Sequence, residues 1–254
     1  MTVGDVGIGV AIGLVSGLLA GLFGVGGGIV MTPGIQVLLG APPIVALATP
    51  LPVIFPTALA GALAYRRRGE IDVRAAAWIV APGIVGAAVG AWLTGSIDTR
   101  LLLVVTALLL GWQAIAILRG GERRRTARPA TAPILGGIGA VAGLVSGLLG
   151  IGGGLVIVPL LAGWLGMPLK RALGTSLLAI VALVIPGTVV HGALGHLDLG
   201  ICLALMVGAI PGARIGAALA LGAKERTLRL VVGCGLLVIS IAYAIEQASA
   251  MLDS

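Results

Sequence analysis

Charged side chains are scarce in this sequence. Only 10% of the 254 residues are charged, against about 25% in an ordinary soluble domain. Aromatic residues contribute 3%, whereas the hydrophobic residues together reach 59%. Because no water-soluble fold of this length could bury so much apolar surface, the composition excludes a soluble domain and predicts a membrane protein.

Residues that support catalysis or metal binding are also few. Cys202 and Cys234 each lie in an apolar segment and form no CxxC pair, which excludes a disulfide framework and argues against a metal site. No Asp or Glu falls deep inside an apolar segment, no His/Asp/Ser constellation recurs, and there is no Gly-x-x-x-x-Gly-Lys-[Ser/Thr] loop. These gaps disfavour an enzyme and predict neither a cofactor nor a bound metal.

Glycine, in contrast, is abundant and periodic. The chain has 43 glycines, more than twice the usual share of about 7%. When the sequence is aligned with itself at an offset of 126 residues and no gap, every glycine from Gly17 to Gly28 coincides with a glycine from Gly143 to Gly154. The register continues to Gly90 and Gly216. The sequence therefore predicts two similar transmembrane repeats, 1–118 and 133–254, joined by an Arg-rich linker at 119–132.

Each repeat contains five apolar elements of helical length. They cover about 6–23, 28–40, 45–65, 72–95 and 100–118, then 133–149, 154–166, 172–194, 199–221 and 227–247. The first element has no basic flank or cleavage signature and is interpreted as retained. The second element of each repeat is short and contains Pro33 or Pro159, so the first two elements are either tilted helices or a re-entrant hairpin. In either case the chain returns to its starting side after these two elements, and the three further crossings of each repeat leave the second repeat inverted. The sequence thus predicts an all-α polytopic membrane protein whose helices are broken at the Gly-rich motifs.

The basic residues test this inverted topology. If the loops after elements three, five, seven and nine share one side, they contain 14 of the 16 Lys and Arg residues. Only Arg100 falls in an opposite loop and only Arg214 inside a segment. By the positive-inside rule the Arg-rich side is cytoplasmic, and both termini face the outside of the cell membrane. The net charge of +7 thus reflects topology, and no nucleic-acid partner is predicted.

Two glycine motifs are the strongest functional signal. Gly26, Gly27 and Gly28 in one repeat match Gly152, Gly153 and Gly154 in the other. Consecutive glycines interrupt a helix and free backbone N–H groups, and the next half-helix adds a partial positive charge, which suits a small anion. A tight helix–helix turn is the alternative for one copy. Two inverted copies favour a transporter's central site.

These motifs resemble a known family. The two Gly-x-Gly-Gly-Gly motifs, Gly174-Thr175-Ser176 with its partner Ala48-Thr49-Pro50, and the run 208–216 are similar to the TauE/SafE family of membrane permeases over almost the whole chain. The resemblance implies a two-repeat fold and the export of sulfite or organosulfur anions such as sulfoacetate. The chain departs from its own repeat at Pro50, where the second repeat has Ser176.

Polar residues near the motifs complete the candidate binding site. Thr49, Thr175 and Ser176 lie near the starts of the third and eighth elements, where their hydroxyls either donate to substrate oxygens or bond to the helices. Arg214 lies inside the ninth element, where it either contacts the anion or snorkels to lipid phosphates. Gln36 is a weaker candidate, because its partner Ala162 is apolar.

Together these features predict a secondary transporter that exports a small sulfur-containing anion, with the substrate and the lipid bilayer as partners. An uptake permease for another small organic anion and a non-transport membrane scaffold are the alternatives. Export of an anion needs no ATP, since the membrane potential alone favours it. Coupling through sodium-binding carbonyls or through a proton on His191 is the alternative driving mechanism.

Overall fold

Every regular element that the structure describes is a helix. The computed structural model describes residues 3–94, 97, 99–119 and 130–252, so residues 120–129 of the predicted linker lie outside it. The first repeat forms α1 (Val3–Phe23), α2 (Gly28–Pro33), η1 (Gly34–Leu38), α3 (Pro43–Ala48), α4 (Pro50–Arg67), α5 (Val73–Thr94) and α6 (Thr99–Arg119). The second forms α7 (Ala132–Leu149), α8 (Gly154–Pro159), η2 (Leu160–Trp164), α9 (Leu169–Ala193), α10 (Leu199–Gly222) and α11 (Glu225–Leu252). The all-α prediction is confirmed, with boundaries a few residues from those expected.

Six helical segments in the described ranges are long and apolar enough to cross a membrane. They are Gly4–Phe23, Pro43–Arg67, Val73–Thr94, Ala132–Leu149, Leu169–Ala193 and Leu199–Gly222. Gly28–Leu38 and Gly154–Trp164 are shorter. At 1.5 Å per residue their 11 residues rise only about 16 Å, roughly half of a 30 Å hydrocarbon core. The first two elements of each repeat therefore form a hairpin whose return arm is a half-length helix.

Proline shapes each half-length helix. Pro33 and Pro159 end the α-helical turns of α2 and α8, and five residues of wider π-helix follow each of them. Proline supplies no N–H for the i to i−4 bond and its ring crowds the preceding turn, which explains a local change of helical pitch. The same irregularity thus arises at corresponding positions from the same residue.

The main helix pairs each join one repeat to the other. α1 packs along α10, α5 along α7, α4 against α9 and α6 against α11. The first two pairs use glycines whose missing Cβ lets backbone meet backbone: Gly13, Gly17 and Gly21 face Leu205, Ala209 and Ala213, and Gly139, Gly143 and Gly147 face Ile79, Gly83 and Ala87. Such small-residue stripes permit close approach of membrane helices. The two repeats are interleaved and share one core.

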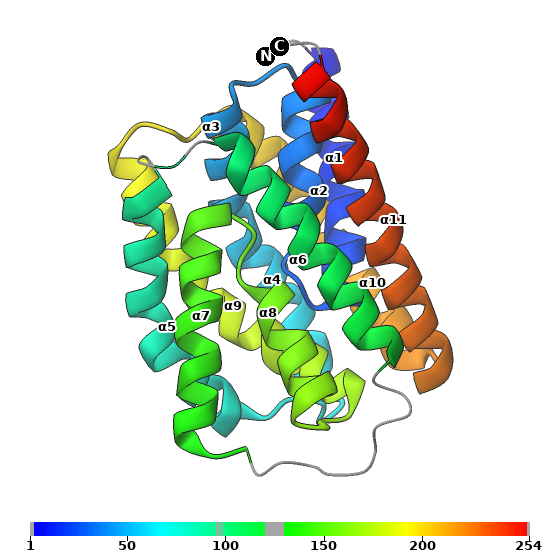
Figure 1. The fold of residues 1–254 in the computed structure, drawn as a ribbon. Helices are drawn as coiled ribbons and strands as arrows, with labels where there is room; N and C mark the ends of the chain where they lie inside the picture. Colours follow the sequence, from blue (N-terminus) through cyan, green and yellow to red (C-terminus); the bar gives the residue numbers. More distant parts are fainter. Residues whose placement is uncertain (1–2, 95–96, 98, 120–129, 253–254) are drawn as a thin grey trace.

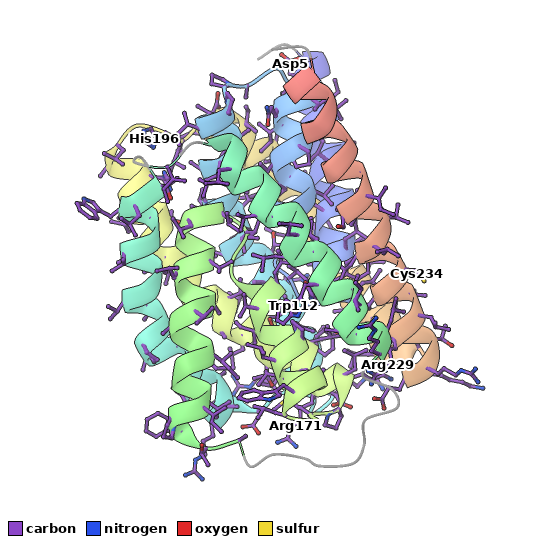
Figure 2. All side chains as sticks on the ribbon, in the orientation of Figure 1. Asp5, Trp112, Arg171, His196, Arg229 and Cys234 are labelled. Atoms are coloured by element: carbon purple, nitrogen blue, oxygen red, sulfur yellow. The ribbon has the colours of Figure 1, made fainter. Side chains whose placement is uncertain are left out.

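The bundle has two chemically distinct ends. α1 begins and α11 ends at the same end, here named the terminal end, at the top of Figure 1. Figure 2 shows Asp5 and His196 at this end and Arg171 and Arg229 at the opposite one, here named the arginine end. The predicted topology makes the arginine end cytoplasmic, and that orientation stays a prediction.

Candidate functional site

The two glycine motifs form turns of the same conformation. In the first glycine turn (Gly24–Gly27), glycines 24, 26 and 27 have φ of 68°, 90° and 92°. In the second glycine turn (Gly150–Gly153), glycines 150, 152 and 153 have φ of 67°, 84° and 79°. Other residues rarely adopt this left-handed region, so the turns require glycine for their backbone as well as for space.

The glycine turns pack directly against each other. A Cβ added to Gly28 would lie 2.9 Å from the carbonyl oxygen of Gly150, and one added to Gly154 would lie 2.6 Å from that of Gly24. Both separations are too short for a real side chain. Each half-length helix therefore starts against the turn of the other repeat, so the two glycine motifs lie side by side.

Two isoleucines fill the space beside both turns. The nearest side-chain atoms to an added Cβ on Gly26 or Gly152 belong to Ile54 and Ile180, at 3.0–3.4 Å. Ile54 and Ile180 are repeat partners, both fully buried, and each is the twelfth residue of a 25-residue span. The turns thus meet at the middle of the two spans that contain α4 and α9.

The candidate threonines make corresponding contacts with the loops before α5 and α10. Thr175 Oγ1 accepts a hydrogen bond from the backbone N–H of Asp72 at 2.9 Å, and Thr49 Oγ1 accepts one from that of Asp198 at 3.3 Å. Both threonines are fully buried. Each lies five residues from the central isoleucine of its helix, about 7.5 Å at 1.5 Å per residue. Because the helices run in opposite directions, the structure does not bring the threonines together.

Ser176 contacts a glycine turn directly. Its hydroxyl donates to the carbonyl oxygen of Gly24 at 2.8 Å, a buried bond that ties α9 to the first glycine turn. The corresponding position in the first repeat is Pro50, which has no hydroxyl. The two halves of the centre are therefore alike in backbone and unequal in hydrogen bonding.

A cavity of about 630 Å³ opens at the terminal end. It is lined by residues of α1, of α3 and the loop before it, and of α10 and the loop before it: Asp5, Leu39, Ala41, Pro42, Val45, Leu197, Asp198, Leu199 and Ile201. Asp198 connects the cavity to Thr49 through its backbone N–H. The cavity thus lies beside the loop that Thr49 holds at the terminal end.

The arginine end carries an ion pair at the equivalent place. Arg171 and Asp72 are the repeat partners of Val45 and Asp198, and the Arg171 guanidinium lies 3.2 Å from the Asp72 carboxylate. The side chains are 46% and 30% exposed. A salt bridge so exposed contributes little stability, about 0–1 kcal/mol, but it closes over the loop that Thr175 holds.

Other predicted candidates lie away from the glycine turns. Arg214 is on the exposed face of α10, which favours snorkelling over anion contact, and Gln36 is half-buried in η1. His191 is buried near the terminal end, with Nδ1 3.1 Å from Nδ1 of His196. No group of three or more His, Cys, Asp or Glu able to hold a metal ion occurs in the described ranges. Arg214 and Gln36 are therefore left out of the site that we propose.

Three buried polar residues carry little signal in the sequence. The side chains of Ser16, Gln113 and Ser146 are fully buried, and their oxygen and nitrogen atoms have no hydrogen-bond partner among the described residues. Each unpaired polar group costs about 1–3 kcal/mol. A single amide in the apolar element 100–118 was the available signal for Gln113, but its repeat partner Ile239 offered no symmetry to support it.

Comparisons with known proteins agree on the class of the chain. The profile of a family described as Sulfite exporter TauE/SafE matches residues 9–243. A probable membrane transporter protein of Xylella fastidiosa is 31% identical over 242 residues, covering 91% of this chain and 92% of that protein. The probable membrane transporter protein YunE of Bacillus subtilis is 28% identical, covering 91% and 94%. No solved structure matches the chain.

Proposed function

Because the chain belongs to the Sulfite exporter TauE/SafE family, we propose that it exports a small sulfur-containing anion, sulfite or an organosulfonate, across the cell membrane. Membership makes the chain a multi-pass membrane transporter of a small solute, and confirms the prediction that it is not an enzyme. The substrate, the direction and the site are the proposed part.

One observation carries the proposed site: two left-handed glycine turns meet beside Ile54 and Ile180, halfway along two spanning helices. Broken helices at the middle of the membrane leave backbone groups for a substrate, where side chains would block access. N–H groups without a Cβ beside them suit the oxygen atoms of a sulfite or sulfonate group. The anion binds between the turns when the isoleucines separate.

The path toward this site follows α4 and α9. From the terminal end it runs through the cavity beside Asp198 to Thr49, then to Ile54 and Ile180. On the far side it continues to Thr175 and ends under the Arg171–Asp72 ion pair. In our proposal the anion enters after this ion pair opens and leaves through the cavity.

The membrane potential supplies the driving force. An interior that is negative by 100 mV favours outward movement of one negative charge by about 2.3 kcal/mol. A divalent oxyanion gains about twice as much. The described spans offer no buried carboxylate for a proton relay, which supports a carrier driven by voltage.

Proteoliposomes test the function. Sulfite or an organosulfonate is loaded inside, and a potassium-diffusion potential is imposed with no sodium or pH gradient. Anion flux should run toward the positive side and should reverse when the sign of the potential is reversed. Flux that ignores voltage and follows a proton or sodium gradient contradicts the mechanism, and flux of neutral solutes or metal cations in place of anions contradicts the substrate class.

A variant links this flux to the centre. Ile54→Ala with Ile180→Ala removes the pair between the turns and should change the anion flux, whereas Ile84→Ala, on the exposed face of α5, should not. Equal flux in all three proteins would place the path elsewhere.

A further inference from the structure

A small cavity in the first repeat shows what the second repeat has changed. The cavity has a volume of about 10 Å³ and lies between α1, α2 and α11. Eight residues line it: Leu19, Ala20, Phe23, Val25, Gly27, Ile29, Val30 and Ile239. Such a volume is close to the minimum for one water molecule, and an apolar lining of this kind holds none.

The repeat partners of these eight residues are Val145, Ser146, Leu149, Ile151, Gly153, Leu155, Val156 and Gln113. Six pairs are apolar or glycine on both sides. In the remaining two pairs the residue that lines the cavity is apolar and its partner is polar, since Ala20 corresponds to Ser146 and Ile239 to Gln113. The second repeat thus places its polar groups where the first repeat lines a cavity with apolar ones.

The structure supports the same placement independently of the repeat. α6 packs against α7 and α8, the helices that flank the second glycine turn. Ser146 belongs to α7, and its Cβ lies 3.4 Å from a Cβ built on Gly153. Gln113 and Ser146 are both fully buried, and Gln113 Oε1, Gln113 Nε2 and Ser146 Oγ all lack partners. Buried polar groups normally have a hydrogen-bond partner, so a group without one points to a water molecule or an ion beside it.

We propose that Gln113 Oε1 and Ser146 Oγ bind a sodium ion behind the second glycine turn. A site for one atom fits the scale of the corresponding cavity, whereas a sulfonate group does not. Oxygen ligands without charge, beside the end of a broken helix, are a known way to hold sodium within a membrane. The end of α7 adds a partial negative charge that favours a cation.

The ion orients the turn. Ser146 lies against Gly153, whereas Ile54 and Ile180 lie against Gly152. An ion held by Ser146 therefore supports the turn at Gly153 and leaves free the contact with the isoleucines, where the anion of the proposed function binds. The role that we give to the ion rests on the proposed function, whereas the measurement of sodium binding does not depend on it.

Thermal unfolding of the purified full chain in detergent tests the site. Sodium chloride should raise the Tm over choline chloride of the same concentration, and the rise should grow with the logarithm of sodium concentration above the Kd. Gln113→Met should abolish the sodium-dependent rise. Since it removes unpaired polar atoms without changing the volume much, its Tm in choline should equal or exceed that of the natural chain. Ser146→Ala should weaken the sodium-dependent rise in Tm in the same way. Ser16→Ala is its matched control and should leave the rise unchanged, because Ser16 is also buried and unpartnered but is not a proposed ligand.

The outcomes separate sodium from other occupants. Gln113→Glu retains the oxygen ligands and adds a charge, so it should enlarge the sodium-dependent rise; a smaller rise together with loss of sulfite stabilisation would make the pair an anion site and overturn the proposal. A Tm of the natural chain that is equal in sodium and choline would also overturn it. Sulfite stabilisation measured in choline is a separate readout of the proposed function, which can hold while the sodium site fails.

Discussion

The two ends of the bundle share a backbone plan and differ in chemistry. At the terminal end Val45 and Asp198 line an open cavity, whereas at the arginine end their partners Arg171 and Asp72 form an ion pair. The threonines beneath them accept the same hydrogen bond from the same loop position. The two ends are thus alike in backbone and unequal in side chains, and in the proposed transport path they act as two gates.

Under the proposed function this comparison bears on the resting conformation of the carrier, while the membrane potential sets the direction of net flux. Identical gates would give a carrier with no structural preference for either side. The ion pair holds the gate at the arginine end closed, whereas an apolar residue takes the place of Arg171 at the terminal end. In our proposal the resting structure is therefore open toward the terminal end.

The largest expected effect is on the contact between the glycine turns. Gly28→Val and Gly154→Val each force a side chain against the opposite turn and should lower stability by at least about 1–3 kcal/mol, with anion flux lost in both. Gly137→Val is the control, because nothing lies within 4 Å of a Cβ added there. Thermal unfolding and flux measure the effects. A folded, active Gly154→Val protein beside an inactive Gly28→Val protein would break the equivalence of the halves.

A smaller effect is expected at the threonines. Thr175→Val leaves the Asp72 N–H without its partner and should cost about 1–3 kcal/mol. Thr49→Val should cost less, since its hydrogen bond is 3.3 Å long instead of 2.9 Å. Thr57→Val serves as the control, because the Thr57 hydroxyl bonds only to its own helix at Val53. Chemical denaturation ranks the three variants, and a larger loss for Thr49→Val than for Thr175→Val contradicts the ranking.

The smallest change in stability is expected where the ends differ most. Arg171→Val copies Val45 at the arginine end and should change stability by no more than about 1 kcal/mol. Without the ion pair this gate should open more often. A cysteine placed at Ile71, the partner of the cavity residue Leu197, should then react faster with a thiol reagent in a Cys234→Ala background. In the same cysteine protein with Arg171 retained, high salt should also speed labelling, because it screens exposed charges. Labelling that is unchanged by Arg171→Val would show that Arg171 is not part of the gate.

Most of the fold was predictable because the bilayer imposes it. Apolar length and glycine periodicity located the helices to within a few residues, and Pro33 and Pro159 marked the irregular ones. The length of the return arms was not decided by the sequence, since a tilted helix and a half-length helix have the same composition. The packing of α2 and α8 against the opposite glycine turns identifies the return arms as half-length helices.

The candidate site was predictable where both repeats carry the same glycine or polar residue, and it was hidden at apolar positions and where the repeats differ. Glycine turns in both repeats identified the centre, and Thr49 and Thr175 were found in the same way. Their separation along α4 and α9 was not foreseen, because the repeat offset aligns residues without showing that inversion carries them to opposite ends. Ile54 and Ile180 resemble every other core residue in the sequence, and Gln113 lacks a polar partner in the repeat.

The packing of α1 along α10 has a consequence for biosynthesis. About 180 residues separate the end of α1 from the start of α10, and ribosomes add about 5–20 residues per second. α1 therefore waits in the membrane for about 10–35 s with its glycine stripe uncovered. During that time lipid or an insertion chaperone must shield the stripe, and a nascent chain arrested before α10 exposes a surface that quality-control proteases can recognise.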